Sequence, residues 1–157
     1  EHLGVPVIRT VCERLKVPND HRALAVLACR FHLVCGRALE LKPATVMKYL
    51  EQTDALRRPE RFADLLLVCT ADARGRLGFE DDPFPQAERF RAALSAAQRV
   101  RTDALAASGL TGKALGDALR AARVDAIAAL DPSLWQQAPA SPPVPGPASP
   151  AAGDSRQ

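Results

Sequence analysis

Apolar residues recur every three or four positions in successive segments of this sequence, and prolines and glycines fall mostly between those segments. That spacing places the apolar side chains on one face of an α-helix, whereas the alternation typical of strands is rare. A chain of 157 residues is long enough to bury one core. The sequence therefore predicts an all-α, multi-helix bundle. Helices are predicted over residues 5–17, 19–35, 41–56, 57–73, 86–100 and 113–130, with a short helical turn over 103–108.

The apolar stripes of these segments predict which side chains form the core. In the first segment Val7, Val11 and Leu15 recur at i, i+4 and i+8, which predicts burial along that face. Three of the four cysteines occupy apolar helical positions and none forms a CxxC pair, which predicts reduced, buried thiols. The other stripes predict these core residues: Leu24, Leu27, Phe31, Val34, Val46, Met47, Leu50, Phe62, Leu65, Leu66, Cys69, Phe90, Leu94, Ala97, Leu115, Leu119, Ala122 and Ile127.

The helical pattern stops near residue 132. Residues 138–157 are rich in proline, alanine and serine and have almost nothing to bury, so we predict a disordered tail over 132–157. No apolar run approaches the roughly 18 residues of a membrane span, and no signal peptide opens the chain. These features predict a soluble, cytoplasmic protein without a membrane partner.

Five arginines flank the segment predicted as the fourth helix. Arg57, Arg58 and Arg61 cluster at its start, and Arg74 and Arg76 at its end. A basic helix start opposes the helix dipole, but it suits a bound anion, because free backbone N–H groups and guanidinium forks together hold phosphate. These arginines are therefore candidate contacts to a nucleic-acid backbone, although a net charge of +3 does not by itself demonstrate such a partner. The alternative is a solvated basic face paired with Glu60, Asp64, Glu80, Asp81 and Asp82.

His32 is the candidate metal ligand, near the end of the second predicted helix. The alternative is a half-buried histidine that the helix dipole stabilises. A metal site needs two or three further His, Asp or Glu side chains. The residues that follow His32 are apolar, so the partner within this chain is either Asp54 or Asp72. We assign His32 and Asp54 as the candidate metal pair and leave Asp72 open as the alternative.

Three long segments follow one another in this order: VCERLKVPNDHRALAVLACRFH, ELKPATVMKYLEQTDALRRPERFADLLLVCTADARGRLGFEDDPFPQ and GLTGKALGDALRAARVDAI. Together they resemble the C-terminal half of bacterial CCA-adding enzymes, the tRNA nucleotidyltransferases of the multifunctional type that carry an HD phosphohydrolase domain. The resemblance covers about residues 1–131 and implies an HD-type domain end over 1–56 and a helical tRNA-binding body over 57–131. The chain does not begin with methionine, so we expect a C-terminal fragment.

The resemblance also implies partners and chemistry. Such enzymes add C, C and A to the tRNA 3′ end from CTP and ATP, and carboxylates of a separate head domain hold Mg²⁺. No residue of this chain is assigned to that catalysis, and we expect the chain alone to be inactive. Our hypothesis is that Arg57, Arg58, Arg61, Arg74 and Arg76 meet phosphates of the tRNA acceptor region. A poly(A) polymerase of the same superfamily, or a structural helical module without RNA binding, remains the alternative.

The HD-type region departs from the pattern of its family. His32 matches the later histidine of the HD domain, which implies a divalent transition metal there. Many relatives follow that histidine with a polar residue, often Asp, and place another His three positions further on. This sequence has Leu33 and Gly36 at those places, which argues against phosphohydrolase activity.

Overall fold

The structure is a computed structural model that describes residues 4–107 and 109–133. Within these residues the chain forms seven α-helices, one short 3-10 helix and no strand, which confirms the all-α prediction. The predicted tail lies outside the described residues from residue 134 onward. The elements are α1 Gly4–Arg14, α2 Asn19–Gly36, η1 Ala38–Glu40, α3 Pro43–Gln52, α4 Pro59–Arg74, α5 Pro85–Arg99, α6 Thr102–Ala106 and α7 Gly112–Ala128.

Proline begins three of these helices. Pro43, Pro59 and Pro85 are the first residues of α3, α4 and α5. The N–H of the first helical residue has no acceptor within the helix, so proline loses no hydrogen bond there, and its fixed φ already matches a helix. Pro59 thereby sets the start of α4 and limits the turn after α3 to residues 53–58. This short turn holds Arg57 and Arg58.

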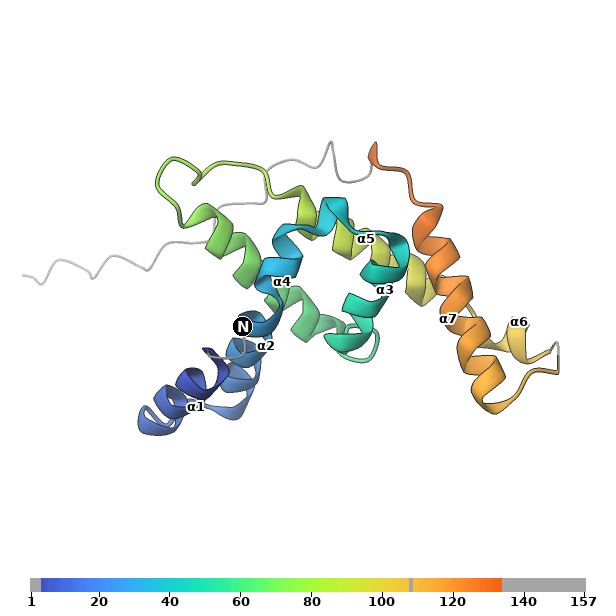
Figure 1. Ribbon diagram of the computed structural model, residues 1–157, viewed down its shortest axis with the longest axis horizontal. Coiled ribbons are helices and arrows are strands. Elements are labelled where there is room, and N and C mark those ends of the chain that lie inside the picture. The colour runs from blue at the N-terminus through green and yellow to red at the C-terminus, as the bar shows by residue number, and fades with distance from the viewer. Residues whose placement is uncertain (1–3, 108, 134–157) are drawn as a thin grey trace, which may run out of the picture.

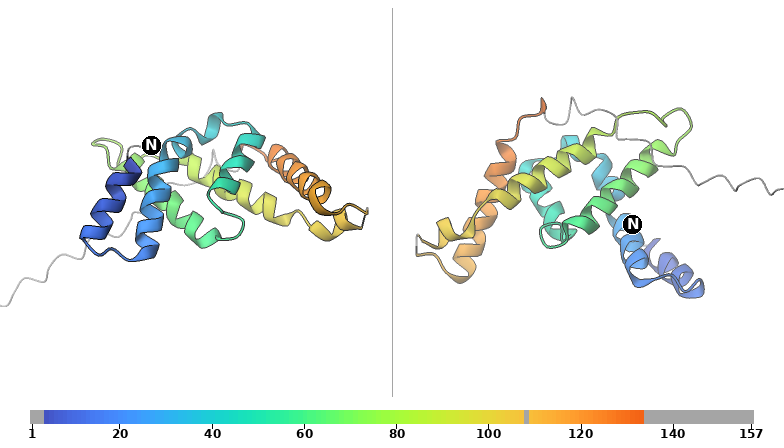
Figure 2. Two further views of the ribbon diagram at one scale, coloured as in Figure 1. Left: turned by 60° about the horizontal axis from the view of Figure 1, so that its bottom comes forward. Right: turned by 180° about the vertical axis from the view of Figure 1, so that it is seen from behind.

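An aromatic core lies among α3, α4 and α5, in the middle of the elongated molecule (Figures 1 and 2). The ring of Tyr49 stacks on that of Phe90 with centroids 4.2 Å apart. Phe62 meets both rings edge-on, with centroids 6.1 Å away in each case. The core stripes predicted for these three helices are confirmed, because all of the following are buried: Val46, Met47, Leu50, Phe62, Leu65, Leu66, Cys69, Phe90, Leu94 and Ala97.

The helices that flank this core are less deeply buried. α2 packs on α4, whereas α7 packs on α3 and α5. The Nε of Arg120 lies 2.9 Å from a carboxylate oxygen of Glu51 and so joins α7 to α3. Of the predicted α7 stripe only Ile127 is fully buried. The α2 stripe is partly buried and packs against the core at Leu24, Leu27, Phe31 and Val34.

The predicted core face of α1 is wrong. Val7, Val11 and Leu15 are 62%, 38% and 62% exposed, whereas Val5 and Cys12 are buried. The physical reason is that α1 packs mainly against α2, at one end of the molecule (Figure 1). One neighbouring helix covers only part of the apolar arc of α1, and the predicted stripe lies on the remaining part.

The cysteines match the prediction of free, mostly buried thiols. None of the four forms a disulfide; Cys12, Cys35 and Cys69 are buried and Cys29 is partly so. The hydrogen bond to Cys35, together with burial, raises the pKa of the Cys69 thiol, so that this thiol stays protonated at neutral pH. These side chains therefore act as small apolar core residues.

Over residues 4–107 and 109–133, no helix combines the length and the apolar character that crossing a membrane requires.

Candidate nucleic-acid interface

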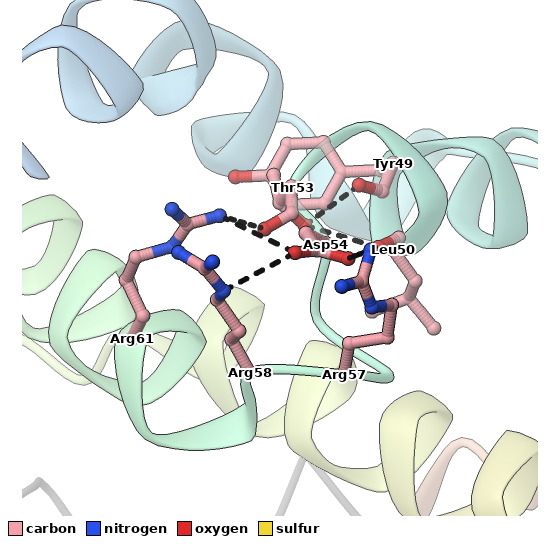
Figure 3. A network of polar contacts seen from close by, with 7 residues as sticks. All are labelled: Tyr49, Leu50, Thr53, Asp54, Arg57, Arg58 and Arg61. Carbon is pink, nitrogen blue, oxygen red and sulfur yellow. Dashed lines mark hydrogen bonds and ion pairs between the residues drawn. The ribbon is translucent and has the colours of Figure 1, made fainter. Parts of the chain in front are cut away.

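Arg57, Arg58 and Arg61 surround the carboxylate of Asp54, in the turn between α3 and α4 (Figure 3). The Nη1 of Arg57 lies 3.9 Å from Oδ1 of Asp54. The Nε of Arg58 and the Nη2 of Arg61 lie 3.5 Å and 3.9 Å from Oδ2. Arg58 and Arg61 approach from one side of the carboxylate and Arg57 from the other. We call these four residues the Asp54 cluster.

The backbone of this turn fixes where the arginines begin. Asp54 follows α3 and has the left-handed φ of 57°, a conformation that aspartate tolerates better than most residues. Its carbonyl oxygen accepts the backbone N–H groups of Arg57 and Arg58, at 3.2 Å and 2.9 Å. The buried hydroxyl of Thr53 donates to the carbonyl of Tyr49 at 2.8 Å. Local hydrogen bonds thus hold the turn against the aromatic core.

The Asp54 cluster keeps an excess of positive charge. One carboxylate faces three guanidinium groups, and the closest approach of 3.5 Å exceeds the 2.7–2.9 Å of a charge-assisted hydrogen bond. The side chains of Arg57 and Arg58 are 80% and 58% exposed, and that of Arg61 is 28% exposed. Arg61 also donates to the carbonyl of Thr53 at 3.3 Å. Most guanidinium donors of the two outer arginines therefore face solvent.

The acidic partners expected for a paired basic face are not the ones observed. Asp54 lies three, four and seven residues before the arginines it contacts. Glu60 and Asp64 form no ion pair with them in the described part of the chain. Both acids instead line a neighbouring cavity of about 410 Å³ between the starts of α2 and α4, together with Asp20, His21, Arg58 and Arg61.

Arg74 and Arg76 lie at the other end of α4 and line a second cavity, of about 290 Å³. The Nε of Arg74 donates to the backbone carbonyl of Asp82 at 3.0 Å, which ties the end of α4 to the loop 75–84. A carboxylate oxygen of Glu80 accepts the backbone N–H of Gly78 at 2.8 Å. The loop is therefore held by its own backbone groups and one acid, while Arg76 is exposed.

His32 and Asp54 are not brought into one site. His32 is half-buried, and its Nδ1 lies 2.9 Å from the carbonyl oxygen of Ala28. It lines the cavity at the end of α4, as does Asp72, whereas Asp54 does not. Across the described residues there is no group of three His, Cys, Asp or Glu side chains placed to hold a metal ion. The pairing of His32 with Asp54 stays a prediction, and of the two alternatives only Asp72 shares the cavity of His32.

The sequence analysis missed the role of Asp54 in the arginine cluster. The spacing held part of the signal, because residues three and four positions apart are neighbours wherever the chain turns helically; the left-handed conformation of Asp54 was not foreseeable. The residue pattern alone predicts a metal-binding role for Asp54 and offers as partners of the arginines only acids within and after the fourth predicted helix. The turn itself supplies the shared carboxylate.

Comparison with known proteins finds that the chain is similar to proteins named multifunctional CCA proteins. The chain is 50% identical over 127 residues to the multifunctional CCA protein of Thioalkalivibrio sulfidiphilus, which covers 81% of this chain and 31% of that protein. It is 50% identical over 129 residues to the multifunctional CCA protein of Xanthomonas euvesicatoria, covering 82% and 32%. For that of Hahella chejuensis the identity is 43% over 127 residues, covering 81% and 30%. The chain thus spans about a third of the length of these relatives.

The other two comparisons add no relatives. No family model matches the chain, and no solved structure matches it.

Proposed function

We propose, on the premise that this chain is homologous to bacterial multifunctional CCA proteins, that it serves as a helical tRNA-binding part of an enzyme that adds CCA to tRNA 3′ ends. The complete enzyme would take tRNA, CTP and ATP as substrates and hold Mg²⁺ in a separate head domain. None of that chemistry is assigned to residues of this chain, whose contribution is to bind and orient the RNA.

The observation that carries this proposal is the charge of the Asp54 cluster. Three guanidinium groups share a single carboxylate, and two of them are more than half exposed. A phosphate group offers several oxygen acceptors to planar guanidinium forks and relieves the mutual repulsion of the cations. An RNA backbone supplies such phosphates independently of sequence, as a protein that binds many different tRNAs requires.

The spacing of the two basic regions favours a polynucleotide over a mononucleotide. At about 1.5 Å per residue, the part of α4 from Arg61 to Arg74 is about 20 Å long. Both regions adjoin the packing of α2 on α4, one at each end. One RNA that contacted both would run along α4, and we propose that Arg74 and Arg76 add contacts to the backbone beyond the Asp54 cluster.

Charge reversal tests the proposal in the full chain. A variant with Arg57, Arg58 and Arg61 all changed to Glu is titrated with an unmodified tRNA transcript at about 50 mM and 200 mM salt. We expect at least about tenfold weaker binding at the lower salt and a flatter salt dependence, since each lost phosphate contact removes close to one unit of slope. The matched control reverses Arg9, Arg14 and Lys16, three exposed cations at α1, and should bind nearly as the unmodified chain does.

The outcome separates this proposal from its alternatives. Equal losses in both variants would show that binding follows net charge and not the Asp54 cluster. If the unmodified chain does not bind the transcript at either salt concentration, the structural helical module becomes the better interpretation.

A further inference from the structure

We propose that Asp54 is a positioning residue for RNA binding, which orients Arg57, Arg58 and Arg61 toward phosphate, and that it is not a metal ligand. The inference rests on the proposed function, because it names the residue that organises the same binding site. The observation behind it is that one side chain meets three cations and that the same residue receives two backbone hydrogen bonds from the arginines it meets.

The carboxylate is placed to set directions and not to neutralise the cluster. Its two oxygens are divided, with Oδ1 toward Arg57 and Oδ2 toward Arg58 and Arg61. At 3.5–3.9 Å these contacts draw the guanidinium groups inward without occupying their donors with short hydrogen bonds. Without a central anion, the three cations would repel one another and point apart.

The backbone of Asp54 supports the same role. Its left-handed conformation turns the chain sharply after α3, and its carbonyl then accepts the N–H groups of Arg57 and Arg58. One residue therefore fixes both the origin and the direction of the two exposed arginine side chains. Less conformational freedom is left to lose when a phosphate binds, which is how preorganisation raises affinity.

The surroundings of Asp54 argue against a divalent cation there. Three guanidinium groups within 4 Å of the carboxylate would repel a metal ion. His32, the other candidate ligand, lines a cavity at the opposite end of α4 that Asp54 does not reach. A carboxylate that already organises cations needs no metal to account for its position.

Two variants, each with one acidic residue neutralised, distinguish a positioning role of Asp54 from a simple effect of net charge on RNA binding. Asp54→Asn keeps the size of the side chain and tolerates the left-handed backbone, while Asp64→Asn removes an equal charge from an exposed position one turn into α4. The net charge of each variant is one unit more positive than that of the unmodified chain, so electrostatics alone would tighten RNA binding in both. We expect Asp54→Asn to bind the tRNA transcript about fivefold more weakly than the unmodified chain, and Asp64→Asn to bind equally or slightly more tightly.

The salt dependence and the thermal midpoint complete the binding experiment. Asp54→Asn should show a flatter salt dependence, because fewer phosphates are held at once, with a thermal midpoint close to that of Asp64→Asn. If Asp54→Asn binds as tightly as Asp64→Asn, the positioning role is overturned while the proposed function stands.

A second measurement needs no RNA. Nitrogen-15 spectra report the order of the arginine Nε–H groups in the chain without RNA. The side chains of Arg58 and Arg61 should be less ordered in Asp54→Asn than in the unmodified chain. In Asp64→Asn their order should equal that of the unmodified chain. Unchanged side-chain order in Asp54→Asn would overturn the inference whatever the chain binds. Ordered arginines in a chain that fails to bind the transcript would instead overturn the proposed function, and with it the phosphate as the ligand.

Discussion

The two ends of α4 carry the same residue type in opposite settings. At the start, three arginines share the carboxylate of Asp54, on a turn that is hydrogen-bonded to itself and backed by the aromatic core. At the end, Arg74 is tied to a backbone carbonyl of an exposed loop whose Leu77 is 94% accessible. If both ends bind anions as proposed, the start of α4 would be the preorganised site and its end the more adaptable one.

The largest expected difference between the two ends of α4 is in how much a truncated side chain lowers the free energy of unfolding. Phe62 is the fourth residue of α4, directly after Arg61 in the chain, and is 1% exposed. Truncation by Phe62→Ala should lower the free energy of unfolding by about 3–5 kcal/mol, because it leaves a cavity among the aromatic rings. Leu77→Ala in the exposed loop should change it by less than about 0.5 kcal/mol. Urea denaturation measures both.

If Phe62→Ala and Leu77→Ala lose similar amounts of unfolding free energy, the proposed contrast between the two ends of α4 is wrong. The loop at the end of α4 would then be packed as firmly as the turn at its start. If Phe62→Ala does not fold, Phe62→Leu keeps most of the buried volume and should lose about 1 kcal/mol, still more than Leu77→Ala.

The loop at the end of α4 is expected to depend on a single backbone conformation. Gly78 has φ of 87°, so Gly78→Ala adds a Cβ to a conformation that costs about 1–2 kcal/mol for other residues. Hydrogen exchange should become faster at the amides of Gly78 and Phe79, which are bonded within the loop. Gly116→Ala is the matched control, because Gly116 lies in the interior of α7 with open space around it and should gain about 1 kcal/mol.

If exchange in the loop is unaffected by Gly78→Ala, the loop is already open in solution. The end of α4 would then have no defined anion site, and the comparison between the two ends would become sharper.

The sequence predicted the central helices better than the ends of the molecule. The stripe Val46, Met47 and Leu50 is buried as expected, because α3 is enclosed by α5 and α7 and periodicity alone then determines which face is covered. The equally regular stripe that includes Val7 and Leu15 is exposed. Periodicity shows that a helix has an apolar face, but only the neighbours decide whether that face is covered.

The candidate site was likewise predictable from the sequence only in part. The clustering of Arg57, Arg58 and Arg61 followed from the sequence, since residues so close along the chain cannot lie far apart. Their sharing of the Asp54 carboxylate depends on the left-handed conformation of that residue, which the sequence does not specify. The cavity that holds His32 and Asp72 depends on how α2 packs on α4, a contact between residues forty positions apart.

A smaller effect separates the two basic regions in RNA binding. Changing Arg74 and Arg76 together to Glu should weaken binding of the tRNA transcript about threefold, less for each reversed charge than the reversal of Arg57, Arg58 and Arg61. The reason is that Arg74 already donates to a carbonyl and Arg76 belongs to an adaptable loop. A loss per charge equal to that at the Asp54 cluster would contradict a difference in preorganisation. The comparison is made by titration at the same two salt concentrations.

The smallest effect is a response of the loop to acid. The backbone N–H groups of Glu80 itself and of Gly78 hold the pKa of the Glu80 carboxyl below its usual value. Because the folded pKa is lowered, this contact is fully formed above the ordinary glutamate range and is lost as the pH falls through the lowered pKa. The Gly78 amide shift, followed by NMR against pH, should therefore titrate below the ordinary glutamate range, and Glu80→Gln should abolish the response. A midpoint at or above that range would mean that the carboxylate does not hold the loop, which would leave Arg74 as the contact that ties the end of α4 to residues 75–84.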